Sequence, residues 1–422
     1  MKVSIQTLGS LGDVMPYIAT AKRLRGLGAD VSILAPRDYT DIIRAHGIAA
    51  AAPPDFSLET WNREAEERGT LTNPLKFLRD WQEMVVPYVA DITDRCLAAA
   101  DGADVILANG ICAPARLAAE RNRIPYLLHA LQPVISPTSD IPCAMVWRPW
   151  HGDAFNRLGY GTVWAAQRFM EQALKTHRRQ LRLTDMPPLS HTQTHLGQPL
   201  PRITSTSPAL IANRPTDWKA NDHLLAYPSL DSASAASLPA EIRRFAESGP
   251  PPIFVSLGSL ESDTPAPLLA AVFAALEARG VRTIVSEGLA ARLTPEQAAT
   301  VCLVGHVPHA ALLPICGGIL HHGGAGTTDS ALRAGIPQII FPQRLDQFWH
   351  ARRMADIGVA PAPLSQRAGD TSAVRNALDF VHRPDVWKRA KELSASLLNR
   401  DGALELAGLI ISETARFQQN AK

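Results

Sequence analysis

The chain has 422 residues, more than the roughly 250 to 300 that one hydrophobic core accommodates, so two domains are expected. Its 42 basic and 40 acidic residues leave a net charge of only +2, which argues against binding nucleic acid or an anionic membrane through charge. The five cysteines are scattered without a CxxC pair, so neither a disulfide framework nor a structural zinc site is expected.

Short β-branched runs alternate with helical patterns from the N-terminus onward. Four strands are predicted in the first half, at Val3–Thr7, Val31–Leu34, Val105–Ala108 and Pro125–His129. Such alternation is typical of a parallel sheet with helices on both faces. We therefore expect residues 1–229 to form a Rossmann-like α/β domain.

The N-terminal sequence MKVSIQTLGS reaches polar and glycine residues at once, and no stretch of 18 apolar residues occurs. These features predict neither a signal peptide nor a transmembrane segment, and with the scattered cysteines they favour a cytoplasmic location. They leave open peripheral contact with a membrane and the oligomeric state.

The loop after the first strand, LGSLGDVMP, is not a dinucleotide-binding fingerprint, because Gly9 and Gly12 are three apart without a third glycine in register. An NAD-binding interpretation is weakened accordingly. Asp13 stands near the start of the following helix, so helix capping alone would explain it.

Aromatic residues concentrate in Cys143–Leu181, among them Trp147 and Trp150. Helices packed on the first domain would explain this segment. An apolar wall for an acceptor would also explain it, because aromatic side chains offer a large contact area at modest entropic cost. His129, at a strand end, and His151 are candidates for side chains that assist catalysis, although packing is the more common role for such histidines.

A stretch rich in proline, serine and alanine, residues 230–250, is predicted to be a linker with one short helix. Alternation then restarts, so residues 251–402 are expected to form a second Rossmann-like domain. Its predicted strands are Ile253–Leu257, Thr283–Ser286, Cys302–Val304, Gly318–Leu320 and Gln338–Phe341. Ligands of such sheets bind at the carboxyl ends of the strands. Residues 403–422 are expected to form a helix that returns to the first domain.

The segment Gly305–Gln347 is the richest in chemistry, because a strand runs into HHGGAGTT and then into a helix. Glycines let the backbone approach an anion, and the free amides and dipole of a helix N-terminus favour phosphate. An ordinary tight turn with a threonine cap is the alternative. Farther on, Asp346 and Gln347 offer the carboxylate and amide that adjacent sugar hydroxyls require, although a plain helix start would look the same.

Three spaced elements resemble the signature of family 1 glycosyltransferases, bacterial branch. They are His322–Thr328, Gly335–Pro337 and Asp346–Gln347. This branch includes antibiotic, sterol and carotenoid glycosyltransferases and the rhamnosyltransferase of rhamnolipid synthesis. The resemblance implies the α/β GT-B fold, in which two Rossmann-like domains face a central cleft, and transfer of a sugar from a nucleotide diphosphate.

The same resemblance implies roles for individual residues of the second domain. The diphosphate would contact Ser259, His322, Gly324, Gly326 and Thr327. The base would lie on His306 and Val307, where family members commonly have a tryptophan and its successor, and Asp346 and Gln347 would hold the sugar. Ser330 stands where plant members carry a ribose-binding glutamate, which leaves UDP and dTDP donors hard to separate.

In the first domain, Gly12–Pro16 matches the family's Gly-His-x-x-Pro or Gly-Asp-x-x-Pro, which implies that Asp13 is the general base. Ser10, His129, Trp147 and Trp150 are then the expected acceptor-binding residues. Inverting displacement requires a base for the alcohol proton and stabilisation of the departing diphosphate. No metal is required by this chemistry, and the chain contains no Asp-x-Asp triplet.

We therefore expect an inverting, metal-independent hexosyltransferase without a cofactor beyond its nucleotide-sugar co-substrate. UDP-glucose is the first expected donor and a dTDP-sugar such as dTDP-rhamnose the second, with a small apolar hydroxylated acceptor. A nucleotide-sugar epimerase of the same architecture and an inactive glycosyltransferase-like partner subunit are the alternatives. The joint presence of Asp13, His322, Asp346 and Gln347 favours transfer.

Overall fold

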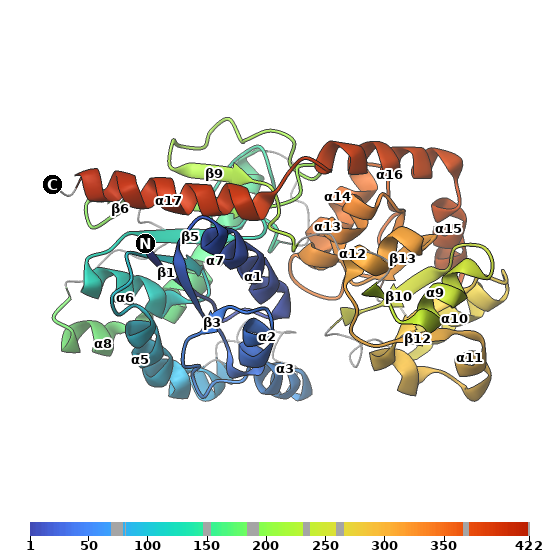
Figure 1. Cartoon of the computed structure of the whole chain (residues 1–422), viewed down its shortest axis with the longest axis horizontal. Helices are drawn as coiled ribbons and strands as arrows, with labels where there is room; N and C mark the ends of the chain where they lie inside the picture. The colour runs from blue at the N-terminus through green and yellow to red at the C-terminus, as the bar shows by residue number, and fades with distance from the viewer. Residues whose placement is uncertain are drawn as a thin grey trace.

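The computed structural model describes residues 1–68, 79–80, 82–146, 153–183, 194–230, 237–258, 266–365 and 371–420. Two α/β domains lie side by side along the long axis of the molecule (Figure 1). The chain passes from the first domain to the second after β9 and returns between α16 and α17.

The sheet of the first domain has seven strands in the order β3-β2-β1-β4-β5-β8-β9, and all neighbours are parallel. The strands are β1 (Lys2–Gln6), β2 (Asp30–Leu34), β3 (Ala49–Ala50), β4 (Val105–Asn109), β5 (Tyr126–Ala130), β8 (Arg202–Ser205) and β9 (Asp222–Leu225). The four predicted strands are confirmed within one residue at each end. The edge strands β3 and β9, and β8 beside β9, were not predicted.

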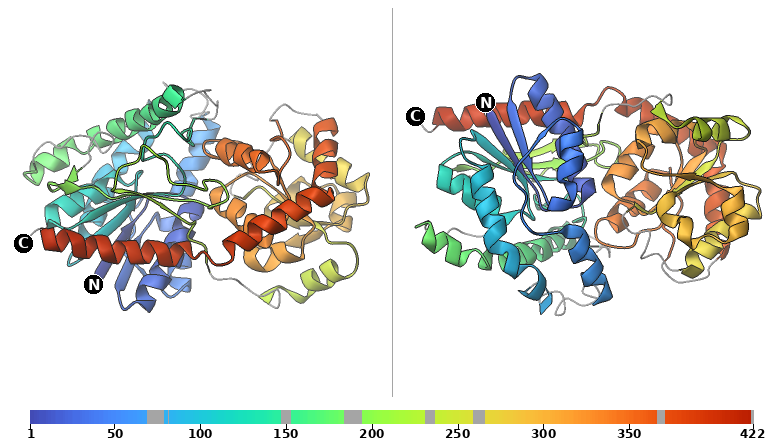
Figure 2. Two further views of the ribbon diagram at one scale, coloured as in Figure 1. Left: turned by 90° about the horizontal axis from the view of Figure 1, so that it is seen from above. Right: turned by 60° about the horizontal axis from the view of Figure 1, so that its bottom comes forward.

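Helices cover both faces of this sheet, as the views in Figure 2 show. They are α1 (Leu11–Gly26), α2 (Thr40–Ala45), α3 (Leu58–Glu67), α5 (Val89–Ala99), α6 (Ala113–Asn122), α7 (Asp153–Gln172) and α8 (Lys175–Gln180). A short hairpin, β6 (Thr194–His195) and β7 (Gln198–Pro199), precedes β8. The last helix, α17 (Gly402–Asn420), packs against α1, with Leu406 and Ile410 buried in the same core as Val3 and Ile5.

The second sheet has five parallel strands in the order β12-β11-β10-β13-β14. They are β10 (Ile253–Ser256), β11 (Thr283–Ser286), β12 (Cys302–Val304), β13 (Gly318–His321) and β14 (Gln338–Ile340), which confirms all five predicted strands within one residue. The helices of this domain are α9 (Ala240–Glu247), α10 (Ala266–Glu277), α11 (Pro295–Thr300), α12 (His309–Leu312), α13 (Ala325–Ala334), α14 (Gln347–Asp356), α15 (Thr371–Val381) and α16 (Pro384–Leu397). Leu238 and Ile242 are buried against Phe254, so α9 packs as part of the second domain.

The two domains meet where the helix after β1 touches the helix after β13, because α1 contacts α13. Arg353 of α14 donates a hydrogen bond to the carbonyl of Leu210 at 2.8 Å, and Ile211 shares a hydrophobic cluster with Trp349. We call this region the domain junction. Within the described ranges, no helix is both long enough and apolar enough to span a membrane.

Candidate active site

The loop after β1 is fixed by the end of the neighbouring strand. The Thr7 hydroxyl accepts hydrogen bonds from the Gly9 amide at 3.0 Å and from the Asn109 side chain at 2.7 Å. Asn109 is the last residue of β4, which pairs with β1. The parallel sheet therefore holds the turn that leads into α1.

Asp13 lies in the first turn of α1, where its Oδ2 accepts hydrogen bonds from the Ser10 amide at 2.9 Å and the Ser10 hydroxyl at 3.1 Å. A Cβ at Gly9 would collide with the Asp13 carboxyl group, so glycine leaves room for it. The pKa of Asp13 is raised to about 6, chiefly by burial and then by the charge of Asp346, against the two Ser10 bonds that lower it. Asp13 is thus both a helix-capping side chain and a carboxylate with increased basicity.

Glycines shape the loop between β13 and α13. Gly323 has φ +90°, and a Cβ there would lie 2.9 Å from the Ile340 side chain, so both backbone conformation and packing require glycine. Gly324 is the N-cap of α13. The first amides of a helix have no intrahelical partner, so those of α13 can donate hydrogen bonds to a ligand at the domain junction. Gly326 and the partly exposed Thr327 lie in this first turn.

The His322 ring lies between two glycines of different loops. A Cβ at Gly324 would approach its Nε2 to 2.5 Å, and a Cβ at Gly258, after β10, would approach its Cε1 to 2.8 Å. Burial, with smaller contributions from His309 and Arg344, lowers the pKa of His322 to about 4. The ring is therefore neutral at physiological pH and can donate one hydrogen bond.

His321 braces the same loop, a role that sequence reasoning missed. Its Nε2 donates to the Gln338 side-chain oxygen at 2.9 Å, and its Nδ1 accepts the Gly323 amide at 3.1 Å. Burial lowers the pKa of His321 to about 3, which agrees with a neutral ring that has one donor and one acceptor. The sequence signal that could have predicted this role was the position of His321 at the end of a strand, β13.

Asp346 is the N-cap of α14 and follows Leu345, which has φ +51°. Burial raises the pKa of the Asp346 carboxyl to about 6. The Gln347 side-chain oxygen accepts the amides of Gln343 at 2.8 Å and Arg344 at 3.1 Å, so it organises the loop before the helix. His350, one turn farther along and buried, places its Nδ1 3.6 Å from Asp346 Oδ2. His350 was not among the predicted site residues, although the i, i+4 spacing brings it beside Asp346.

The remaining residues expected to bind the donor differ in how exposed they are. His306 is exposed after β12, whereas Val307 packs partly into the core of the second domain. A Cβ at Gly305 would lie 3.1 Å from the Glu287 carboxylate, which brings the loops after β11 and β12 together. Ser259 lies outside the described residues.

The structure places His129 inside the first domain, away from any surface. The side chain is 0% exposed, its Nδ1 lies 3.1 Å from the Tyr17 hydroxyl, and its Nε2 lies 2.9 Å from the Ser205 hydroxyl. Burial lowers its pKa to about 3. His129 therefore ties α1, β5 and β8 together, and its enclosure corrects the expectation that it contacts an acceptor.

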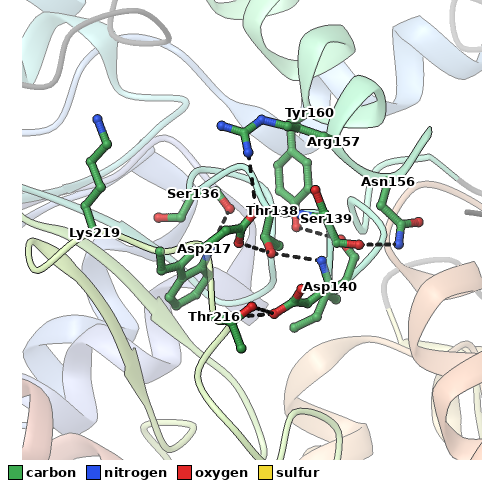
Figure 3. Close-up of polar contacts among 12 residues, drawn as sticks. Ser136, Thr138, Ser139, Asp140, Asn156, Arg157, Tyr160, Thr216, Asp217 and Lys219 are labelled. Atoms are coloured by element: carbon green, nitrogen blue, oxygen red, sulfur yellow. Dashed lines mark hydrogen bonds and ion pairs between the residues drawn. The ribbon is translucent and has the colours of Figure 1, made fainter. Parts of the chain in front are cut away.

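Polar contacts anchor the loop that leads to the expected aromatic wall (Figure 3). Asp217 accepts hydrogen bonds from the Thr138 hydroxyl at 2.5 Å and the Ser139 amide at 2.9 Å. Asn156 of α7 donates to the Ser139 carbonyl at 2.8 Å. Of the aromatic residues, Tyr160 is 0% exposed and belongs to the core. Trp147, Trp150 and His151 lie outside the described residues.

The fold therefore brings Asp13 of one domain and Asp346 of the other close enough for their charges to interact, at the junction where α1 meets α13. Three elements of the second domain converge there: the β13–α13 loop, the start of α14 and the end of β10. In the part of the chain that the structure describes, no group of three or more His, Cys, Asp or Glu side chains is arranged to hold a metal ion.

Comparisons with known proteins agree with this architecture. Residues 3–136 match the model of the glycosyltransferase family 28 N-terminal domain, and residues 280–411 match that of the erythromycin biosynthesis protein CIII-like C-terminal domain. Vancomycin aglycone glucosyltransferase from Amycolatopsis orientalis is 30% identical over 446 residues, which cover 99% of this chain and 98% of the relative. A sterol 3-beta-glucosyltransferase from Arabidopsis thaliana is 26% identical, with 95% of this chain and 66% of the relative covered.

A solved structure, that of glycosyltransferase VinC in complex with dTDP, superposes with a TM-score of 0.68 at 19% identity and covers 99% of this chain and 100% of that chain. This likeness extends over both domains and shows the GT-B fold. The match to vancomycin aglycone glucosyltransferase, which covers both chains almost completely, shows the family to which this chain belongs. The chain therefore belongs to the family 1 glycosyltransferases of the bacterial antibiotic type, enzymes that act on nucleotide sugars in natural-product glycosylation.

Proposed function

We propose that this enzyme transfers a hexose, with inversion at the anomeric carbon, to a hydroxyl of a small apolar acceptor, with Asp13 as the general base. The observation that carries the proposal is the position of the Asp13 carboxylate. It lies at the domain junction, where α1 contacts α13, and its pKa is raised to about 6.

The second domain would bind the donor through neutral hydrogen-bond donors. The amides at the start of α13, the Thr327 hydroxyl and the His322 ring would contact the diphosphate, together with Ser259. The dipole of α13 favours this charge and stabilises it further as the diphosphate departs. The exposed His306 ring offers a surface for the base, and the Val307 backbone follows it.

The sugar would be held by Asp346 and Gln347. The Gln347 side-chain oxygen is occupied within the loop, so its amide nitrogen would serve as the donor to a sugar oxygen. The Asp346 carboxylate would accept the neighbouring hydroxyl. The buried His350 ring lies beside this carboxylate, with its Nδ1 3.6 Å from Asp346 Oδ2.

In the transfer step, the acceptor oxygen would bond to the anomeric carbon as the bond from that carbon to the diphosphate oxygen breaks. Asp13 would take the acceptor proton, and the diphosphate would leave with the electron pair. The two Ser10 hydrogen bonds orient the carboxylate, and its raised pKa makes it a stronger base than an exposed aspartate. This step uses no metal ion.

For the donor, we propose UDP-glucose first and a dTDP-sugar such as dTDP-rhamnose second. The first choice is supported by the two sequence relatives, both named as glucosyltransferases, and the second by the dTDP bound to VinC. For the acceptor, the relatives named for a vancomycin aglycone and for sterols support a largely apolar alcohol or phenol, with Trp147 and Trp150 as its proposed wall and Ser10 beside the reacting hydroxyl.

The test mixes purified protein and EDTA with UDP-glucose or dTDP-rhamnose and a panel of apolar alcohols and phenols. Release of nucleoside diphosphate and product mass are followed. We expect diphosphate release that depends on acceptor and a product heavier by one hexosyl unit. Sugar isomerisation without transfer would indicate an epimerase, and donor binding without any turnover would indicate an inactive partner subunit.

A further inference from the structure

Tyr227 stands where the chain leaves the first domain, two residues after β9 ends at Leu225. The side chain is 5% exposed. A Cβ at Gly326 would lie 3.0 Å from the Tyr227 hydroxyl oxygen, so the hydroxyl faces the first turn of α13. A residue of the interdomain connection thus reaches the proposed diphosphate site.

Both connections between the domains hold Tyr227 in place. The amide of the preceding residue, Ala226, donates to the Glu405 carboxylate of α17 at 3.0 Å. A Cβ at Gly402, the first residue of α17, would collide with the carbonyls of Ala226 and Tyr227. The close packing against Gly402 fixes the Tyr227 backbone, so its side chain has a defined position at the junction.

The Tyr227 hydroxyl has no hydrogen-bond partner among the residues that the structure describes. The nearest carboxylate on α13, Asp329, is already engaged by Arg333 at 2.7 Å and by Ser229 at 3.3 Å. Burial, followed by the charges of Asp329, Asp13 and Asp346, raises the pKa of Tyr227 well above its ordinary value. The hydroxyl therefore keeps its proton at every working pH, and an anion at α13 would be a suitable acceptor for it.

We propose that the Tyr227 hydroxyl donates a hydrogen bond to the diphosphate of the donor bound at the start of α13. This inference rests on the proposed function and adds a contact from the interdomain connection to those of the second domain. It also gives a reason for glycine at position 326, because any side chain there would push the hydroxyl away. Donor affinity would then depend on how the two domains are placed.

The test compares wild type with Tyr227→Phe by calorimetric titration with UDP, dTDP and inorganic pyrophosphate. We expect the Kd of the nucleoside diphosphates to rise about tenfold, the usual effect of losing a hydrogen bond to a charged group. The matched control is Tyr160→Phe, which removes a buried hydroxyl that donates to the Ile141 carbonyl at 3.1 Å. It should leave the Kd unchanged.

A second variant, Gly326→Ala, tests the same contact without touching tyrosine. It should weaken binding in the wild-type background and have little further effect when combined with Tyr227→Phe, because both changes remove one interaction. A Kd of Tyr227→Phe within twofold of wild type, or full additivity in the double variant, would overturn the inference alone. Failure of the wild type to bind either nucleoside diphosphate would overturn the proposed function as well.

Discussion

The proposed donor side and the proposed acceptor side of this enzyme are built differently. On the donor side, most candidate residues lie in two short segments, 321–328 and 346–350, each at the end of a parallel strand. On the proposed acceptor side, Ser10 and Asp13 share one segment, whereas the loop that leads toward the proposed wall is anchored by residues far apart in sequence, Thr138 and Asp217. A site encoded in one motif can be found by residue spacing, whereas a site assembled by distant contacts cannot.

The hydrogen bonds that hold the loops differ in the same way between the two proposed sides. His321 holds Gly323 and reaches Gln338 on the neighbouring strand, within one stretch of sequence. Asp217 holds Thr138, which lies 79 residues earlier. The loop proposed to bind the donor is therefore held by contacts close in sequence, while the loop on the proposed acceptor side is held by a contact between distant segments of the first domain.

The largest expected effect separates catalysis from binding. Asp13→Asn should lower kcat about a hundredfold or more, because the amide cannot take the acceptor proton. The donor Kd should change little, since the amide oxygen can still accept the Ser10 hydrogen bonds. Steady-state transfer and donor titration measure the two quantities. A variant that turns over like wild type would remove Asp13 from the reaction.

A smaller effect is expected on the donor side from Gly324→Ala. The added methyl group would displace the His322 ring, whose Nε2 lies 2.5 Å from the Cβ position, and the donor Kd should rise about tenfold to a hundredfold. Gly408→Ala in α17 is the matched control, because a Cβ there meets nothing within 4 Å. Equal donor affinities of the two variants would contradict the role given to this loop.

The pH profile reports on Asp13 and Asp346 together. Both carboxyls have a pKa raised to about 6, so kcat/KM should fall about tenfold per pH unit below that value as Asp13 takes up a proton. The residual activity of Asp13→Asn should lack the part of this fall that Asp13 causes and keep only the part that protonation of Asp346 causes. A profile that stays flat down to pH 5 would place the base elsewhere.

The raised pKa of Asp346 also makes the stability of the folded protein depend on pH. The pKa of Asp346 is higher in the folded than in the unfolded chain. The contribution of its protonated carboxyl to the free energy of unfolding is therefore full below about pH 4 and is lost as pH rises through 6. Asp346→Asn should therefore raise the free energy of unfolding at pH 8 by about 1–2 kcal/mol. Chemical denaturation at both ends of the range checks this, and a gain that does not grow with pH would contradict it.

The smallest effect is expected on the acceptor side. Asp217→Asn weakens the hold on Thr138 and Ser139, so the acceptor KM should rise about threefold while the donor Kd stays unchanged. Asp385→Asn, which removes an exposed ion pair with Arg383, is the control. A larger change in donor binding than in acceptor KM would reverse the assignment of the two sides.

The parts of the structure that could be predicted from sequence are those with local causes. The five strands of the second sheet are bounded by glycine and proline turns, which gave their positions within one residue. The strands β8 and β9 were missed, because their burial depends on pairing, of β8 with β5 and of β9 with β8, and not on an internal pattern. His129 looked like a strand-end ligand, but a Tyr17 and Ser205 pair encloses it. Tyr227 carried no motif, since its position arises only where the two domains meet.

The most direct test of the central claim is the anomeric configuration of the product, read by proton NMR with whichever nucleotide sugar the enzyme accepts. Direct attack by a hydroxyl that Asp13 deprotonates predicts a product with the configuration opposite to that of the donor, for example a β-glucoside from α-linked UDP-glucose. A product that retains the donor's configuration would contradict single displacement and the role of Asp13 as its base.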